Sequence, residues 1–290
     1  MQHLLIIELN MGLPQIRTAR EALRKKAIEY AGKVSQTFGA GVKRVNVIGV
    51  PITATNMDDC LALVEERLDD MRGEYVCVSN AHTCVMAHDD PAYWAVQVES
   101  VMSVPDGKPL SVVGSKEVPT MGRVTGPDLM RALLDRSQRT GWSHYLYGDT
   151  PEHLVALLGA LTRNYPKARI AGAEPSVFRP LSLQEKAELA ERVNTSGADL
   201  MWVAIGAPRQ EVLCRDLKGC TNALMVGVGG AFNVLAGVVP EAPQWMQLAS
   251  LEWLYRLIQE PKRLFKRYLT TNIKFIAYQI MHAKRREGTS

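Results

Sequence analysis

Short apolar runs alternate with longer amphipathic segments through the middle of the chain. The runs have the length and the β-branched content of buried strands, and they occupy residues 45–50, 75–79, 144–148, 168–171, 199–205 and 224–228. The segments between them have helical composition, at residues 55–71, 125–139, 150–165, 183–195 and 207–217. This alternation predicts an α/β fold, a mainly parallel Rossmann-like sheet with helices on both faces and right-handed crossovers.

The pattern divides the chain into three parts. Residues 1–40 form a predicted N-terminal helical extension, which ends at Gly39-Ala40-Gly41. Residues 41–242 form the predicted α/β core. Residues 243–290 form a C-terminal helical appendage, because 243–259 and 261–282 are predicted helices with no strand between them. The sequence assigns no role to the extension.

Positive charge is concentrated in the appendage. Between Arg256 and Arg286 only Glu260 opposes the basic residues, which are Arg256, Lys262, Arg263, Lys266, Arg267, Lys274, Lys284, Arg285 and Arg286. Basic residues combined with aromatic and aliphatic ones are typical of a helix that lies on a membrane surface. A helix pair packed on the sheet with a solvated basic face fits the same pattern. The net charge of +4 is too small to indicate nucleic acid binding, and none is expected.

Composition otherwise fits an intracellular globular protein. The five cysteines form no CxxC pair, so we expect small buried apolar residues in a reducing compartment and no zinc site. No secretory signal is apparent at the N-terminus. The apolar tract 223–240 is interrupted by glycines and by Asn233, so it predicts strand, turn and short helix rather than a membrane span. A cytoplasmic location is expected.

Candidate chemistry gathers where predicted strands end. Asp106 lies in the turn Val104–Pro109, just after a short expected strand, and Asn80 and His82 follow the strand 75–79. Arg123 precedes a predicted helix. In open α/β sheets such positions bind ligands, and one carboxylate there can act as a base toward a hydroxyl. Asp-Gly is also a common turn dipeptide, so Asp106 alone could be a turn former.

Two glycine-rich turns add further binding positions. Gln210 lies in the first turn of a helix after Gly206, where free N–H groups suit phosphate or sugar hydroxyls and the amide can both donate and accept. The turn 226–233 differs from the dinucleotide fingerprint because Phe232 replaces its final glycine. A phosphate-binding P-loop is absent from the sequence as well. No nicotinamide, nucleotide or other cofactor is therefore expected.

Six motifs occur together and in order: Asn80-Ala-His-Thr83, Pro105-Asp-Gly107, Arg123-Val-Thr-Gly-Pro-Asp128, Gly206-Ala-Pro-Arg-Gln-Glu211, Gly227-Val-Gly-Gly-Ala-Phe232 and Leu251-Glu-Trp-Leu-Tyr-Arg-Leu257. From about Val45 to Tyr268 the chain resembles the WecG/TagA/CpsF glycosyltransferases, glycosyltransferase family 26. The resemblance implies inverting transfer from a UDP-sugar to a saccharide borne on undecaprenyl diphosphate, in surface or exported polysaccharide assembly.

The resemblance also implies roles for individual residues. Asp106 would be the catalytic base, Asn80 and Gln210 would lie near the donor sugar, and Arg123 would lie in the same pocket. The appendage would dock on the inner face of the cytoplasmic membrane and bring Arg256 and Arg263 to the diphosphate. A histidine occurs at the place of His82 in some branches, and there it could bind substrate or cap a helix.

The resemblance leaves the substrates open. Teichoic-acid members tend to carry Thr-x-Asn where this chain has Val78-Ser79-Asn80, so N-acetylmannosamine is not fixed as the donor sugar. The oligomeric state is open too, and a homo-oligomer is compatible with the sequence. A basic membrane-binding module without catalysis is the alternative, but it leaves Asp106, Gln210 and the glycine turns unexplained.

We expect no metal in the reaction. The chain has no Asp-x-Asp pair, and its adjacent aspartate pairs fall in or beside predicted helices, where neighbouring side chains diverge by about 100°. Cationic side chains, Arg256 and Arg263 with Lys266 or Arg267, would then stabilise the leaving UDP in place of a metal ion.

Overall fold

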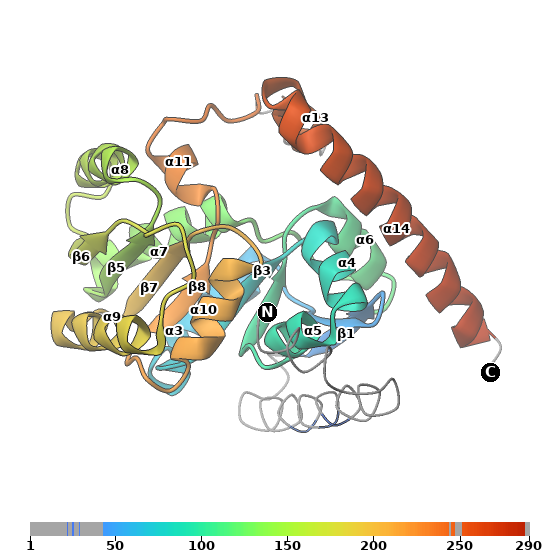
Figure 1. Cartoon of the computed structure of the whole chain (residues 1–290), viewed down its shortest axis with the longest axis horizontal. Coiled ribbons are helices and arrows are strands. Elements are labelled where there is room, and N and C mark those ends of the chain that lie inside the picture. Colours follow the sequence, from blue (N-terminus) through green and yellow to red (C-terminus); the bar gives the residue numbers. More distant parts are fainter. Residues whose placement is uncertain are drawn as a thin grey trace.

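The computed structural model describes residues 43–243, 245–246 and 251–287, together with residues 22, 25 and 29. The predicted extension 1–40 thus lies outside the described residues, apart from three helical positions. All elements that bear on the site fall within the described part of the chain (Figure 1).

A six-stranded parallel sheet forms the centre of the molecule, which confirms the predicted α/β class. The strand order is β4-β3-β8-β7-β5-β6. The strands are β3 (Tyr75–Ser79), β4 (Met102–Pro105), β5 (Ser143–Gly148), β6 (Arg169–Glu174), β7 (Leu200–Ala204) and β8 (Leu224–Gly227). All five residues of β3 are buried, as expected of a parallel strand covered on both faces.

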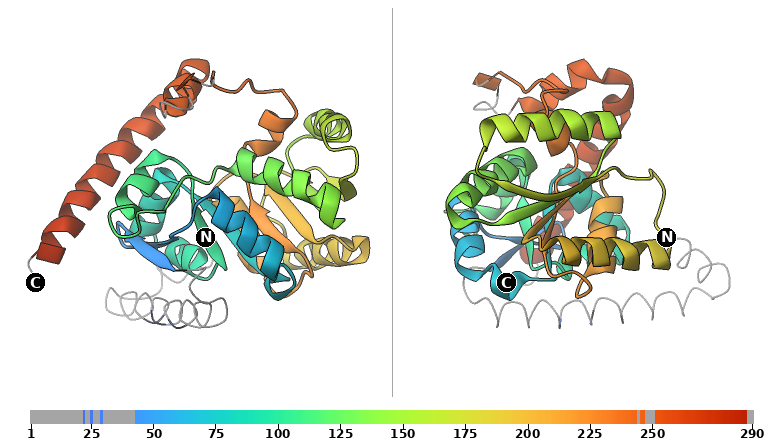
Figure 2. Two further views of the ribbon diagram at one scale, coloured as in Figure 1. Left: turned by 180° about the vertical axis from the view of Figure 1, so that it is seen from behind. Right: turned by 90° about the vertical axis from the view of Figure 1, so that its left-hand side faces the viewer.

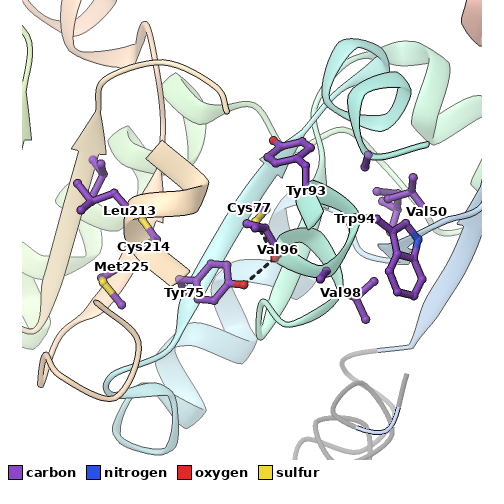
Figure 3. Close-up of a cluster of buried hydrophobic side chains, with 14 of the residues drawn as sticks. Val50, Tyr75, Cys77, Tyr93, Trp94, Val96, Val98, Leu213, Cys214 and Met225 are labelled. Carbon is purple, nitrogen blue, oxygen red and sulfur yellow. Dashed lines mark hydrogen bonds between the residues drawn. The ribbon is translucent and has the colours of Figure 1, made fainter. Parts of the chain in front are cut away.

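Helices cover both faces of the sheet, and two buried apolar clusters form the core. One cluster joins Tyr75 and Cys77 of β3 to α4 (Ala81–Asp89), α5 (Pro91–Val98), α9 (Leu183–Ser196) and α10 (Arg209–Leu217) (Figure 3). The other joins Val76 and Val78 to α3 (Met57–Arg67), α7 (Gly126–Thr140), α8 (Pro151–Asn164) and α11 (Ala231–Leu235). Alternate residues of β3 therefore face opposite layers. The two layers are visible in Figure 2.

The first predicted strand is wrong in one respect. Residues 45–50 are not continuous, because β1 (Arg44–Val47) and β2 (Val50–Thr53) form an antiparallel hairpin separate from the main sheet. Ile48 and Gly49 both have positive φ, 49° and 86°, as a two-residue hairpin turn requires. The predicted helix 55–71 also ends earlier than expected. Helix α3 begins after Asn56, whose side chain caps it, and ends at Arg67, and a 3-10 turn at Asp69–Met71 follows it.

The appendage contains α13 (Glu252–Gln259) and α14 (Pro261–Glu287), and α14 lies alongside α4 before it projects from the core (Figure 1). Lys274 Nζ contacts Asp89 at 2.7 Å, and the Tyr278 hydroxyl donates to the same carboxylate at 2.6 Å. The His88 ring stacks on Tyr278. Of the helices in the described ranges, none is long and apolar enough to cross a membrane.

Candidate active site

The carboxyl ends of four strands bring the predicted site residues to one edge of the sheet. β3 lies between β4 and β8 and pairs with both, while β8 also pairs with β7. From β3 the chain passes to β4 at one edge of the sheet, whereas β8 and the remaining strands lie on the other side of β3 (Figure 1). The strand order therefore switches between β3 and β8. Such a point in the strand order is where open α/β sheets bind ligands.

Asp106 directly follows β4, and backbone hydrogen bonds fix its position. Its N–H donates to the Ser79 carbonyl at 2.6 Å, and the Val124 N–H donates to the Pro105 carbonyl at 2.8 Å. Gly107 then adopts φ +91°, which a residue with a side chain rarely does, and α6 (Lys108–Gly114) begins immediately afterwards. The predicted strand before Pro105 is therefore present, and the carboxyl group is held at its end.

The surroundings of Asp106 suit a general base. Burial raises the pKa of its carboxyl group to about 6, and the Glu252 charge adds to this rise. Arg256, Arg123 and a hydrogen bond from Asn80 act in the opposite direction and lower the same pKa. A carboxyl group with a pKa near 6 is ionised at neutral pH and is a stronger base than an exposed aspartate. The structure thus brings Asn80, Arg123 and Arg256 to Asp106.

Asn80 has two roles at the end of β3. Its Oδ1 accepts hydrogen bonds from the N–H groups of His82 and Thr83, at 3.0 and 3.2 Å, and so caps α4. Thr83 completes a capping box with the Asn80 backbone. Because Oδ1 is occupied by the helix, only Nδ2 of Asn80 is left to donate toward Asp106 or a substrate.

His82 lies between the core and the appendage. Its Nδ1 is 3.1 Å from the Thr271 hydroxyl of α14. The structure therefore places the ring in a contact between α4 and α14, and direct contact of the ring with substrate stays a prediction.

An ion pair joins α13 to the core beside the site. Arg123 donates to both carboxylate oxygens of Glu252, at 2.8 and 3.0 Å, and both side chains are partly buried. Arg256 lies one turn further along α13. Sequence reasoning did not single out Glu252, which lies 129 residues from Arg123 along the chain. The only available signal was its place within the motif Leu251–Leu257.

Gln210 lies in the first turn of α10 and is almost completely buried. Its Oε1 accepts from the Gly206 N–H at 3.1 Å, and its Nε2 donates to Glu211 Oε1 at 2.8 Å. The side chain packs on the glycine turn after β8, where a Cβ at Gly227 would lie only 3.2 Å from Gln210 Cγ. A larger residue at position 227 would displace this amide.

Three other sequence expectations concern Arg263, a metal ion and the cysteines. Arg263 is the third residue of α14, and its side chain lies outside the described residues, so its contact with a diphosphate stays a prediction. Among the residues that the structure describes, no group of three or more His, Cys, Asp or Glu side chains could hold a metal ion. The five cysteines are free, and all but Cys220 are buried as expected.

A carboxyl group of raised pKa beside two arginines, at the carboxyl edge of a parallel sheet, suits an enzyme that transfers a group away from an anionic leaving group. Comparison with known families agrees with this class. The model of the glycosyl transferase WecG/TagA/CpsF family matches residues 45–289, so the chain belongs to that family and is a glycosyltransferase. It therefore acts on a sugar donor and an acceptor substrate. The matched range includes all of α13 and α14, so the appendage belongs to the family's sequence pattern together with the core.

Proposed function

We propose that this glycosyltransferase transfers a sugar, with inversion, from a UDP-sugar to a saccharide carried on a polyprenyl (undecaprenyl) diphosphate. The reaction would take place at the inner face of the cytoplasmic membrane, during the assembly of surface or exported polysaccharide. The observation that carries the proposal is the carboxyl group of Asp106, flanked by Arg123 of the core and Arg256 of the appendage.

The proposed step needs only one carboxylate. As the acceptor oxygen bonds to the anomeric carbon, its proton passes to Asp106. The bond between that carbon and the diphosphate oxygen breaks, and its electron pair leaves with UDP. Arg256 and Arg123 stabilise the negative charge that develops on the diphosphate. Asn80, which follows β3, and Gln210, in the first turn of α10, bind the donor sugar.

Membrane docking is proposed from an exposed apolar face of α14. We call this face the apolar stripe; its members are all more than half exposed, and they are Phe265, Leu269, Ile273, Ile276 and Ile280. Their spacing of three or four residues places them on one side of the helix. The opposite side packs on the core through Leu264, Thr271 and Phe275, which are buried. The stripe and the neighbouring lysines match the composition of an interfacial helix.

Polar substitution in the apolar stripe should weaken membrane binding. We expect the double variant Ile273→Gln/Ile276→Gln to bind anionic phospholipid vesicles at least about tenfold more weakly, because two aliphatic side chains no longer leave water. Co-sedimentation with vesicles measures the change. Val155→Gln, at a 70% exposed position on α8, is the matched control and should bind as the unchanged protein does. Equal binding by both variants would argue against docking through this face.

A panel of UDP-sugars tests the reaction itself. The enzyme is incubated with each donor and a short-chain polyprenyl diphosphate-linked sugar, with and without EDTA, and released UDP and glycosylated lipid are measured. We expect one donor to support transfer, with the rate in EDTA within about twofold of the untreated rate because arginines replace a metal ion. Loss of transfer in EDTA that magnesium or manganese restores would refute metal independence. A homo-oligomer stays a prediction that sedimentation of the same sample can test.

A further inference from the structure

A buried group of polar side chains lies beneath the site, between β3, β4 and α5. The Ser79 hydroxyl donates to Gln97 Oε1 at 2.6 Å, and the Ser103 hydroxyl contacts the same oxygen at 3.1 Å. These three side chains are almost completely inaccessible to solvent. Ser79 precedes Asn80, and its carbonyl accepts the N–H of Asp106. Through Ser79, this group of side chains is therefore connected to the backbone that positions Asn80 and Asp106.

The group continues through Tyr93 of α5, which lies close to Cys77 of β3 (Figure 3). Since Gln97 Oε1 accepts from serines, its Nε2 is directed to the Tyr93 oxygen, 2.9 Å away. The phenol oxygen is thus an acceptor in this bond, and its own proton is available for another acceptor. Tyr93 lies close enough to the Glu211 carboxyl group to lower its pKa, although no hydrogen bond of normal geometry joins these two side chains.

The Glu211 carboxyl group is the hydrogen-bond acceptor at the other end of this group of side chains. It is 1% exposed, its Oε1 accepts from Gln210 Nε2, and its Oε2 is a buried oxygen with no other partner among the described residues. Burial raises its pKa to about 7, while hydrogen bonds from Gln210, its own backbone and Tyr93 oppose that rise. The charge of Glu211 also contributes to raising the pKa of the Cys77 and Cys214 thiols. A buried carboxyl group without a second donor would be costly, and Tyr93 has a hydroxyl proton, not used by Gln97, that could serve as that donor.

The orientation of the Gln210 amide follows from its two partners. The Gly206 N–H can only donate, so Oε1 must face it, and Nε2 is then left to donate to Glu211 Oε1. The amide oxygen thereby accepts one hydrogen bond within the protein, and one of the two Nε2 hydrogens is used as well. A single N–H donor remains beside the glycine turn at Gly227.

We propose that Glu211, with the Tyr93 hydroxyl turned toward it, is a positioning residue that fixes the Gln210 amide so that its Nε2 donates a hydrogen bond to the sugar donor. This inference rests on the proposed function and deepens it. The group of the UDP-sugar that meets Gln210 Nε2 must then be an oxygen acceptor, such as a hydroxyl oxygen, an acyl carbonyl or a phosphate oxygen. The sequence alone left Gln210 able to donate and to accept; its contacts with Gly206 and Glu211 fix the orientation of the amide.

Two substitutions disturb the network without changing the size of a side chain much. Tyr93→Phe removes the proton aimed at Glu211. Glu211→Gln removes the negative charge, and where the new amide nitrogen meets Gln210 Nε2 one donor faces another. Tyr75→Phe is the matched control, because the Tyr75 hydroxyl is equally buried and donates at 2.6 Å to the Val96 carbonyl, outside the network.

We expect Tyr93→Phe and Glu211→Gln each to lower kcat/KM about tenfold or more, through a higher KM for the UDP-sugar. The KM for the lipid-linked acceptor should stay within about twofold of the parent value, since Gln210 does not meet the acceptor. Tyr75→Phe should lose thermal stability as Tyr93→Phe does but keep both KM values. The double variant Tyr93→Phe/Glu211→Gln should lose no more activity than Glu211→Gln alone, because both act through one carboxyl group.

Identical kinetics for Tyr93→Phe and Tyr75→Phe would overturn the inference, and so would losses that multiply in the double variant. A measurement without substrate separates this inference from the proposed function. Hydrogen exchange of the Gly206 amide should accelerate in Tyr93→Phe and Glu211→Gln but not in Tyr75→Phe, because its acceptor Gln210 Oε1 is no longer held. If no UDP-sugar supports transfer, the proposed function fails, while unchanged exchange at Gly206 defeats the network alone.

Discussion

Replacement of Asp106 by Asn should lower kcat for sugar transfer about a thousandfold, with little change in the affinity for the UDP-sugar. The amide has nearly the same size as the carboxyl group, so the backbone bond from Asp106 to Ser79 is retained. It cannot take up the proton of the acceptor hydroxyl, however, and general base catalysis typically contributes about 10²–10⁴-fold. Initial rates of UDP release, combined with titration of the UDP-sugar by calorimetry, measure the two effects separately.

Asp135→Asn is the matched control, because Asp135 is an exposed carboxylate on α7, away from the site. We expect this variant to transfer sugar at the parent rate. Full transfer by a folded Asp106→Asn protein would show that this carboxyl group is not the base.

The pH profile of the unchanged enzyme follows from the same group. Because the pKa of Asp106 is raised to about 6, the carboxyl group becomes protonated and loses its basicity as the pH falls through about 6. Above that pH it is ionised and competent. The acidic limb of kcat/KM should therefore lie near pH 6 rather than near the pKa of an exposed aspartate.

The positions of Asp106, Asn80 and Gln210 could be predicted because each depends on local sequence. Each residue directly follows a strand or begins a helix, and the carboxyl ends of parallel strands necessarily share one edge of the sheet. Apolar runs and capping residues identify those boundaries within a residue or two. The fold class and the positions of these three site residues therefore follow from short-range sequence patterns.

The contacts between distant segments could not be predicted in the same way. The pair of Arg123 and Glu252 joins a loop of the core to α13, and the packing of α5 against α10 brings Tyr93 near Glu211. Neither has a signal in spacing or periodicity, since both depend on how helices pack in three dimensions. The β1–β2 hairpin was missed for a different reason: Ile48-Gly49 lacks the Asn-Gly or Asp-Gly dipeptide that usually marks such a turn.

Replacement of Arg256 by Ala should lower kcat about a hundredfold, because the charge that develops on the leaving diphosphate loses a cationic partner. Lys262→Ala is the matched control; it removes the same charge from an exposed position at the start of α14 and should reduce vesicle binding as much as Arg256→Ala does, but not kcat. A common loss of kcat in both variants would instead indicate a general effect of the positive appendage.

The same variant has a second consequence that a purely membrane-binding arginine would not have. Arg256 is the charge that lowers the pKa of Asp106 most strongly, so its removal should raise that pKa and move the acidic limb of the pH profile upward. Lys262→Ala should leave the limb in place. A shift in the first variant alone would show that α13 lies over the base in the working enzyme. The site would then be complete only with α13 in place over Asp106, and under the proposed function this would couple sugar transfer to the membrane that carries the acceptor.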